Sequence, residues 1–302
     1  MRSQMDSVVI NNASHGDAPL SKDELDAWGS STRARPMPVA EMPVHKFAEF
    51  YNMNHKNRGK AIIFNHVNFT DTTLKARTGT DLDCANLGDK LMRLGFKVST
   101  FHDLTSSEVK KIVDEAAQDD HSESDCLIVS VLSHGEKDII YTKDSAYRTD
   151  SLWTPFTADK CPSLAGKPKI FFIQACQGDK FDSGVLLRRT ETDGSPSSQY
   201  SIPVHADFLV AYSTIPGYFS WRNASKGSWF IQALCQELEE RGDEIDILTL
   251  MTFVCQRVAL NFESNVPMDE TMNRKKQIPC IMSMLTRRLI FINNKPAQNG
   301  IE

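Results

Sequence analysis

Short apolar runs alternate with segments of helical periodicity along the first half of the chain. The runs cover residues 61–64, 126–132 and 170–175, a further strand is predicted at 96–101, and the helical segments cover residues 83–94 and 106–117. Apolar runs of this length, bounded by small or polar residues, are typical of buried strands. Glu108 follows Thr105 by three residues before the second helical segment, which predicts a capping box. Strands that alternate with helices predict an α/β fold, with a largely parallel sheet and helices on both faces.

The regular pattern breaks between residues 178 and 206 and then resumes. Within the break, residues 190–199 are polar and include Gly and Pro, as expected of an exposed linker. Beyond it, the pattern predicts a strand at 208–212, helices at 229–241 and 247–262, and a long final strand at 281–292. Because elements of the same kind occur on both sides, we expect the linker to interrupt one domain without ending it. Linkers of this composition are preferred sites of proteolytic nicking.

Composition and charge narrow the possible functions. The 302 residues are 40% hydrophobic and 24% charged, which is ordinary for a globular protein. The net charge of −5 gives no general reason to expect nucleic acid or an anionic membrane as a partner. No run of about 18 apolar residues predicts a membrane span, and residues 1–12 contain no apolar core of signal-peptide length. Residues 1–42 are rich in Ser, Asn, Asp, Ala and Pro, and we expect them to form a flexible leader.

The cysteines indicate a reducing compartment. Seven are scattered without a Cys-x-x-Cys pair, at positions 84, 126, 161, 176, 235, 255 and 280. An odd, unpatterned set argues against a disulfide framework or a zinc site, so we expect a cytoplasmic protein without a bound metal. Most of these cysteines lie in apolar stretches and are expected to be small buried hydrophobes. Cys176 is the exception, because it follows the end of an apolar run and precedes Gly178 by two residues.

Cys176 is the candidate nucleophile. Open α/β sheets bind ligands at the carboxyl ends of their strands, and Cys176 follows such an end. A thiol needs help from a neighbouring base or cation, because little of it is ionised at neutral pH. His134 ends another predicted strand 42 residues upstream, so the two side chains meet if those strands are neighbours. Gly135 and Gly178 leave the backbone free to approach a bound carbonyl, where amide groups could hold an oxyanion.

Several motifs in order resemble those of caspases and, within that family, those of executioner (effector) caspases. Residues 173–178, Ile-Gln-Ala-Cys-Gln-Gly, contain the Gln-Ala-Cys-x-Gly signature of the family. The resemblance runs from about residue 42 to residue 292. The other matching motifs are Arg-Thr-Gly-Thr-Asp at 77–81, Leu-Ser-His-Gly at 132–135, Ala-Asp-Phe at 206–208, Ser-Trp-Arg-Asn at 220–223, Gly-Ser-Trp-Phe at 227–230 and Lys-Gln-Ile-Pro-Cys at 276–280.

The resemblance implies cysteine-protease chemistry on a caspase-like three-layer α-β-α sandwich. Such a fold has a mostly parallel six-stranded sheet, helices on both faces and small extra β-hairpins. By family position, Cys176 attacks the peptide carbonyl and His134 protonates the leaving amine. The backbone amides of Gly135 and Cys176 stabilise the oxyanion, and the carbonyl of Lys75 orients the histidine. No metal or organic cofactor is implied.

The resemblance also implies protein substrates with an aspartate before the scissile bond. A carboxylate taken out of water needs fixed cations and donors, and the planar fork of arginine suits it. The positions that match the first pocket are Arg77, Gln174 and Arg222, and Ser220 is a further substrate-binding candidate.

More distant substrate pockets are expected to be aromatic. Phe219 and Trp221 should wall a small apolar pocket for the residue before the aspartate. Asn223 and Trp229 should shape the pocket four residues from the cut, where the executioner pattern favours a second aspartate. The loop at residues 264–274 lacks the aromatics of several executioner relatives, which leaves the outer edge of that pocket open.

Two acidic tetrapeptides lie in the segments expected to be exposed. They are Asp-Glu-Leu-Asp, ending at Asp26, and Thr-Glu-Thr-Asp, ending at Asp193, and a small residue follows each. Cleavage there predicts a propeptide of residues 1–26, a large subunit of 27–193 and a small subunit of 194–302, which together form one catalytic domain. Death-type adaptor domains need about 80 residues or more, so a propeptide of 26 residues is too short to contain one. We therefore expect a zymogen activated by an upstream caspase.

The expected partners follow from the processed ends and the last strand. Trimming exposes a tail from Ala27 to Ser30 that resembles the Ala-led tails bound by inhibitor-of-apoptosis proteins. The apolar strand at 281–292 is long for an edge, and such edges invite pairing with another chain. Caspases dimerise through this strand, so we expect a homodimer of large and small subunit pairs that executes apoptosis.

Three alternatives remain open at this point. A catalytically inactive caspase-like regulator or decoy need not keep Cys176, His134 or the pocket arginines. A flavodoxin-like ligand-binding domain fits the strand pattern, but no Gly-rich phosphate loop follows the first strand. A related cysteine peptidase with basic or asparagine specificity is the third, although two arginines in the first pocket would reject a basic side chain.

Overall fold

The computed structural model describes Ala40, residues 43–183 and residues 203–292. Both predicted cleavage sites, Asp26 and Asp193, lie outside the described residues, as do the tail from Ala27 to Ser30 and the linker at 190–199. None of the helices in the described ranges is both long enough and apolar enough to cross a bilayer.

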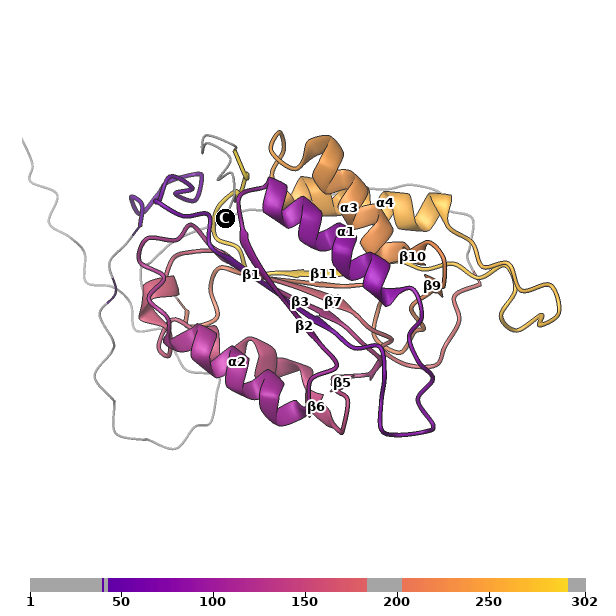
Figure 1. Cartoon of the computed structure of the whole chain (residues 1–302). Coiled ribbons are helices and arrows are strands. Elements are labelled where there is room, and N and C mark those ends of the chain that lie inside the picture. Colours follow the sequence, from indigo (N-terminus) through magenta and orange to yellow (C-terminus); the bar gives the residue numbers. More distant parts are fainter. Residues whose placement is uncertain (1–39, 41–42, 184–202, 293–302) are drawn as a thin grey trace, which may run out of the picture. The chain divides into compact units, whose positions relative to one another are not determined.

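A six-stranded sheet forms the centre of the fold, in the order β11-β8-β7-β3-β1-β2 (Figure 1). Neighbouring strands run parallel, except that β11 is antiparallel to β8. The mostly parallel sheet predicted from the alternation of strands and helices is therefore confirmed. The strands are β1 Lys60–Asn65, β2 Lys97–His102, β3 Leu127–Leu132, β7 Lys169–Gln174, β8 Phe208–Tyr212 and β11 Cys280–Ser283.

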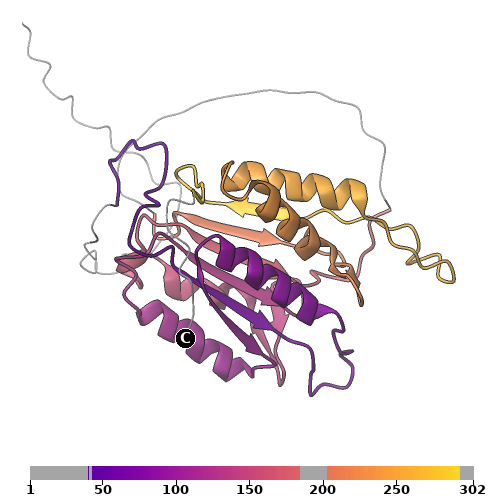
Figure 2. The same ribbon diagram turned by 45° about the horizontal axis from the view of Figure 1, so that its top comes forward.

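Helices cover both faces of the sheet (Figures 1 and 2). On one face lie α1 Thr80–Arg93, α3 Trp229–Arg241 and α4 Ile247–Asn261, and on the other α2 Ser106–Gln118. Side chains alternate between the faces along each strand. In β1, Ile63 packs in the cluster under α1, α3 and α4, whereas Ile62 and Phe64 pack in the cluster under α2. Three short 3-10 turns, η1 Thr149–Leu152, η2 Thr154–Phe156 and η3 Pro162–Leu164, complete the second face.

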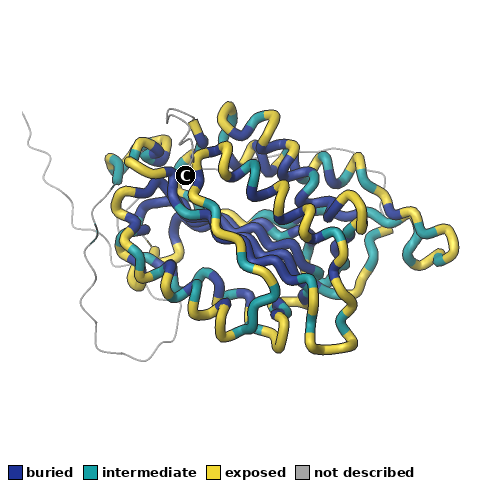
Figure 3. The backbone as a smooth tube through the Cα atoms, in the orientation of Figure 1, coloured by how far each residue is buried: buried dark blue, intermediate teal, exposed yellow. Residues whose placement is uncertain are grey.

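The central strands are buried along their whole length, as the dark tube through the middle of Figure 3 shows. Every residue of β3 and β7 is buried, which explains why these strands are continuous apolar runs in the sequence. The predicted capping box at α2 is present, with Thr105 accepting from the Glu108 amide and Glu108 accepting from the Thr105 amide.

Two small sheets lie outside the central one. The first contains β4 Gly135–Glu136, β5 Ile139–Tyr141 and β6 Ala146–Arg148. The second is the hairpin of β9 Arg222–Asn223 and β10 Gly227–Ser228. They are the small extra β-hairpins that were expected, and each begins at a residue with a predicted role in the site.

The prediction of one long strand at residues 281–292 is wrong. β11 covers only Cys280–Ser283, and its pairing with β8 ends where Met284 donates to the Phe208 carbonyl. Asp207, which precedes β8, has a positive φ of 68°, and its amide makes the last bond of this pairing, to the Met284 carbonyl. The apolar residues farther on, Leu289 and Phe291, are buried in the core under the helices instead of in the sheet.

Candidate active site

The ends of β3 and β7 place Cys176 and His134 at the same edge of the sheet. The parallel ladder pairs Leu132 with Gln174. His134 comes two residues after Leu132, and Cys176 comes two residues after Gln174. A Cβ atom added to Gly135 would lie 2.9 Å from the Cys176 carbonyl oxygen. The segment after His134 therefore packs directly on the backbone of Cys176, and glycine is required there.

His134 is held in one orientation by a backbone carbonyl. Its Nε2 lies 2.7 Å from the carbonyl oxygen of Lys75, and its ring centroid lies 5.0 Å from that of Phe69. A carbonyl can only accept, so Nε2 carries the proton and Nδ1 of the neutral ring keeps its lone pair. Burial lowers the pKa of His134, and the charges of Arg77 and Arg222 lower it further, while the bond to Lys75 opposes them. The imidazole is therefore neutral at pH 7.

The Cys176 thiol lies against the backbone of Ser220. The Ser220 amide donates to Sγ across 3.5 Å, and Sγ lies 3.9 Å from the Ser220 carbonyl oxygen. Burial raises the pKa of Cys176, while the Ser220 bond and the charges of Arg77 and Arg222 lower it. Since burial dominates, the Cys176 thiol is neutral at pH 7, as is the imidazole of His134.

Arg77 and Gln174 bring unpartnered polar atoms into the buried part of the site. Nη1 of Arg77 donates to the His66 carbonyl at 3.0 Å and to Thr80 Oγ1 at 2.7 Å. Its Nε and Nη2 are buried and have no hydrogen-bond partner among the described residues. Gln174 donates from Nε2 to Ser220 Oγ at 2.8 Å, and its buried Oε1 has no partner in the same residues. Unsatisfied buried groups of this kind are costly, which indicates a site built to receive a polar ligand.

Arg222 adds a second guanidinium near Arg77. It is half-buried, and its Nε donates to the Thr78 carbonyl at 3.0 Å. Burial lowers the pKa of Arg77 to about 9, with the charge of Arg222 as the next cause. Both arginines also interact electrostatically with Cys176. Two cations that share a buried site attract an anion, and a carboxylate matches their planar forks.

The family model described as "Caspase domain" matches residues 58–290. The chain belongs to the caspase family. It is 59% identical to Caspase-1 of Spodoptera frugiperda over 287 residues, which cover 95% of each chain. It is 55% identical to Caspase drICE of Drosophila melanogaster over 264 residues, covering 87% of this chain and 78% of that one. It is 44% identical to Caspase-3 of Bos taurus over 247 residues, covering 80% and 88% respectively.

A solved structure agrees with these sequence comparisons. The crystal structure of Caspase-1 from Spodoptera frugiperda matches with a TM-score of 0.79, over 84% of this chain and 99% of that one. The predicted family and fold class are thus confirmed. Caspases are cysteine-type endopeptidases, and this protein is accordingly an enzyme of that class.

The aromatic residues expected in the outer pockets of this caspase form one row. The rings of Phe219 and Trp221 lie 5.3 Å apart, and Trp221 stacks on Trp229 at 5.6 Å. The row has two further members that the sequence did not reveal. Phe181 lies 5.5 Å from Phe219, and Phe262 stacks on Trp229 at 5.5 Å. No local pattern distinguishes these two from ordinary apolar residues, because chain segments far apart in sequence bring them together.

The side chain of Asn223 stabilises the turn that follows it. Its Oδ1 accepts from the amides of Ser225 and Lys226 at 2.9 and 3.0 Å, which closes the turn between β9 and β10. Its role in the pocket four residues from the cut stays a prediction.

Gln277 belongs to the motif at residues 276–280, and no role was predicted for it. Its Oε1 accepts from the Trp221 amide at 2.7 Å, and its Nε2 donates to the Ser213 carbonyl at 2.7 Å. A buried side chain from the segment before β11 thereby fixes the backbone of the aromatic row. Asp83, which sequence reasoning also passed over, is buried beside Arg77 and Arg222.

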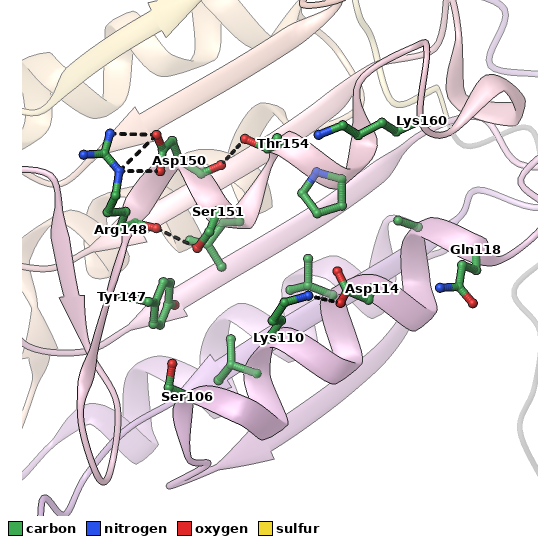
Figure 4. Close-up of a pocket in the computed structure, with 15 residues that line it drawn as sticks. Ser106, Lys110, Asp114, Gln118, Tyr147, Arg148, Asp150, Ser151, Thr154 and Lys160 are labelled. Atoms are coloured by element: carbon green, nitrogen blue, oxygen red, sulfur yellow. Dashed lines mark hydrogen bonds and ion pairs between the residues drawn. The ribbon is translucent and has the colours of Figure 1, made fainter. Parts of the chain in front are cut away.

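A cavity of about 730 Å³ lies elsewhere, between α2 and residues 147–160 (Figure 4). Val109 and Val113 line its apolar wall, and two ion pairs, Lys110 with Asp114 and Arg148 with Asp150, lie on its rim. Neither Cys176 nor His134 contributes to its lining. Within the described part of the chain, no group of three His, Cys, Asp or Glu side chains is placed to hold a metal ion.

Proposed function

We propose that this caspase cleaves protein chains after aspartate, with Cys176 as nucleophile and His134 as its acid–base partner. The observation that carries the proposal is the set of buried polar atoms on Arg77 and Gln174 that have no partner in the described part of the chain. Ser220 joins them to the thiol, because it bonds to both Gln174 and Cys176. A cysteine endopeptidase whose buried pocket contains two guanidinium groups selects a carboxylate side chain.

The neutral state of the pair sets the order of proton transfers. As the thiol attacks the peptide carbonyl, its proton moves to Nδ1 of His134. Nε2 keeps its own proton, which is hydrogen-bonded to the Lys75 carbonyl. The imidazolium then donates from Nδ1 to the leaving amine, and the amine departs with the C-terminal part of the substrate. Water, deprotonated by His134, hydrolyses the thioester and restores the thiol. The amides of Gly135 and Cys176 are proposed to hold the oxyanion.

The first pocket gives a reason for selectivity among acidic and neutral residues. A buried carboxylate without partners costs several kcal/mol. Arg77, Gln174 and Arg222 remove that cost for aspartate, whereas asparagine leaves the guanidinium charges unpaired. The row from Phe219 to Trp229 offers an apolar surface for the residues that precede the aspartate, with a preference near Asp-Glu-x-Asp.

We further propose that the enzyme is made as a zymogen. Cleavage after Asp193 separates a large subunit of residues 27–193 from a small subunit of 194–302, and cleavage after Asp26 removes the propeptide of residues 1–26. Lys180 and Tyr218 lie on either side of the linker and form an isolated backbone bridge, so the two proposed subunits are hydrogen-bonded to each other close to the cut.

The assembly and role are proposals of the same kind. β11 is an edge strand, and its Met282 is 41% exposed, which supports a dimer formed through this strand. Relatives such as drICE and Caspase-3 and the executioner motifs support a cytoplasmic effector of apoptosis, activated by an upstream caspase. The tail from Ala27 to Ser30 is the proposed contact with an inhibitor-of-apoptosis protein.

One assay tests the proposal at its centre. Processed enzyme is given an Asp-Glu-Val-Asp reporter and the same peptide with Asn at its last position, and the Cys176→Ala variant is the control. We expect hydrolysis of the first peptide alone, and by the wild type alone. Equal hydrolysis of the Asn peptide would contradict the specificity, and no hydrolysis of either peptide would contradict cleavage after aspartate.

A further inference from the structure

Asp83 is a fully buried carboxylate in the first turn of α1 with no part in bond breaking. It is 1% exposed, and its partner Ser228 is 0% exposed. The Ser228 amide donates to its two oxygens at 2.8 and 3.0 Å, and the Ser228 hydroxyl donates to Oδ2 at 2.5 Å. Three donor contacts from a single residue make this a specific anchor between α1 and β10.

The anchored residue is the one that pairs with Arg222. In the β9–β10 hairpin, Ser228 is registered opposite Arg222. The strands of this hairpin have only two residues each, so backbone bonds alone hold it weakly. The bond from Asp83 to Ser228 therefore fixes the backbone that carries the second arginine of the first pocket.

The backbone of β10 is shaped to let the carboxylate in. Gly227 has a positive φ of 91°, and a Cβ atom placed there would lie 2.2 Å from Oδ1 of Asp83. Any side chain at this position would displace the carboxylate, which makes the glycine part of the anchor.

The other end of the connection is Arg77. The turn that contains Arg77 leads into α1 through the N-cap Gly79, so Asp83 belongs to the same rigid element. A Cβ added to Gly79 would lie 2.6 Å from the Ala224 carbonyl oxygen, so this turn also packs against the hairpin. Arg222 in turn donates to the Thr78 carbonyl.

We infer that Asp83 is a positioning residue for the substrate carboxylate, because it clamps the Arg222 hairpin to the helix that follows Arg77 and so sets the spacing of the two guanidinium groups. The inference rests on the proposed function, since it explains how that pocket is preorganised. Burial raises the pKa of Asp83 to about 6, against the lowering effect of the Ser228 bonds and of both arginines. The carboxylate is therefore ionised at neutral pH, when its hydrogen bonds are strongest.

Three variants and one control test the clamp. Asp83→Ala removes every acceptor, Asp83→Asn keeps an oxygen for the Ser228 amide, and Ser228→Ala removes only the hydroxyl. Asp89→Asn removes one negative charge from the exposed side of the same helix. Kinetics are measured per active site, titrated with a covalent thiol inactivator, on reporters ending in Asp-Glu-Val-Asp and Asp-Glu-Val-Glu.

We expect Asp83→Ala to raise KM for the aspartate peptide about tenfold and to lower the preference for Asp over Glu by a similar factor. The kcat per titrated site should change less than about threefold, because β3 and β7, whose ends position Cys176 and His134, pair with each other and not with the hairpin. Asp83→Asn should recover to within about threefold of the wild type, with Ser228→Ala between the two and Asp89→Asn unchanged. An unchanged KM and preference in Asp83→Ala, or an Asn variant as poor as the Ala variant, would overturn the inference.

Amide exchange of the free enzyme gives a readout that needs no substrate. Peptides spanning residues 222–229 should exchange at least about tenfold faster in Asp83→Ala than in the wild type and Asp89→Asn. Unchanged exchange would overturn the clamp even if Asp peptides are cleaved. If the wild type cleaves no Asp peptide, the proposed function fails, and the exchange experiment still decides whether Asp83 holds the hairpin.

Discussion

The two sides of the active site are built in different ways. The side that carries Cys176 and His134 consists of the ends of β3 and β7, two fully buried strands joined by a continuous parallel ladder. The opposite side consists of residues 213–228, between β8 and α3, whose regular structure is a hairpin with two residues in each strand. The first side is held by the backbone ladder in the core of the sheet. The second is held by single backbone bonds to residues 173–180 and by side-chain anchors such as Gln277 and Asp83.

This difference separates chemistry from selectivity. Strand ends in a packed sheet hold reacting groups in a narrow range of positions, which proton transfer requires. Loops held by a few side-chain bonds can differ in length and shape without disturbing the sheet. Changes on the strand side should therefore affect kcat, and changes on the hairpin side should affect KM and substrate preference.

The largest expected effect is on the strand side. His134→Ala should lower kcat on the Asp-Glu-Val-Asp reporter about 10³-fold, because the neutral thiol loses its proton acceptor. KM should change less than about threefold. Steady-state kinetics check both values, with His205→Ala, at an exposed histidine before β8, as the control. A loss that appears mainly in KM would contradict the separation.

A second prediction concerns the pocket cations. Arg77→Lys should lower kcat/KM about 100-fold for the aspartate peptide, since an ammonium group cannot replace a buried fork that bonds to His66, Thr80 and ligand together. Most of the loss should appear in KM. Arg93→Lys, at an exposed arginine of α1, provides the matched control. Equal activity of Arg77→Lys and the wild type would contradict a role for Arg77 in binding the substrate carboxylate.

The aromatic row should give a smaller effect that depends on substrate length. Phe262→Ala removes the ring stacked on Trp229 and should raise KM about three- to tenfold for a tetrapeptide reporter. A Val-Asp dipeptide reporter, which does not reach this part of the row, should be unaffected. Phe253→Ala, in the helix α4 that ends just before Phe262, tests for a general effect on packing. A similar loss on both reporters would mean that Phe262 supports the fold and not the pocket.

The smallest effect is on the ionisation of the thiol. Because burial raises the pKa of Cys176 above its usual value, alkylation of this residue should keep accelerating as the pH rises past 8. Arg222→Ala removes a cation that lowers this pKa, so the pKa should rise further. Alkylation at pH 7.5 should then slow about two- to fourfold. Peptide mass spectrometry of Cys176 across pH checks the sign, and faster alkylation in Arg222→Ala than in Arg148→Ala would contradict it.

The regular elements were largely predictable because burial leaves a periodic record in the sequence. β1, β3 and β7 appear as apolar runs, and α2 begins at the capping box formed by Thr105 and Glu108. The wrong prediction of a strand at residues 281–292 shows what such a pattern cannot decide. Leu289 and Phe291 are as apolar as strand residues, but they are buried under helices, and a sequence does not state which surface covers a side chain.

The sequence by itself determined the reacting groups, the family and the order of the elements. Cys176, His134, Arg77 and Arg222 lie in motifs short enough to be recognised locally. Only the tertiary structure decided how these motifs are held together. The bond from Asp83 to Ser228 spans 145 residues, and Phe181 and Phe262 reach the aromatic row from segments on either side of the linker. Such contacts have no local pattern because a fold creates them by closing long loops.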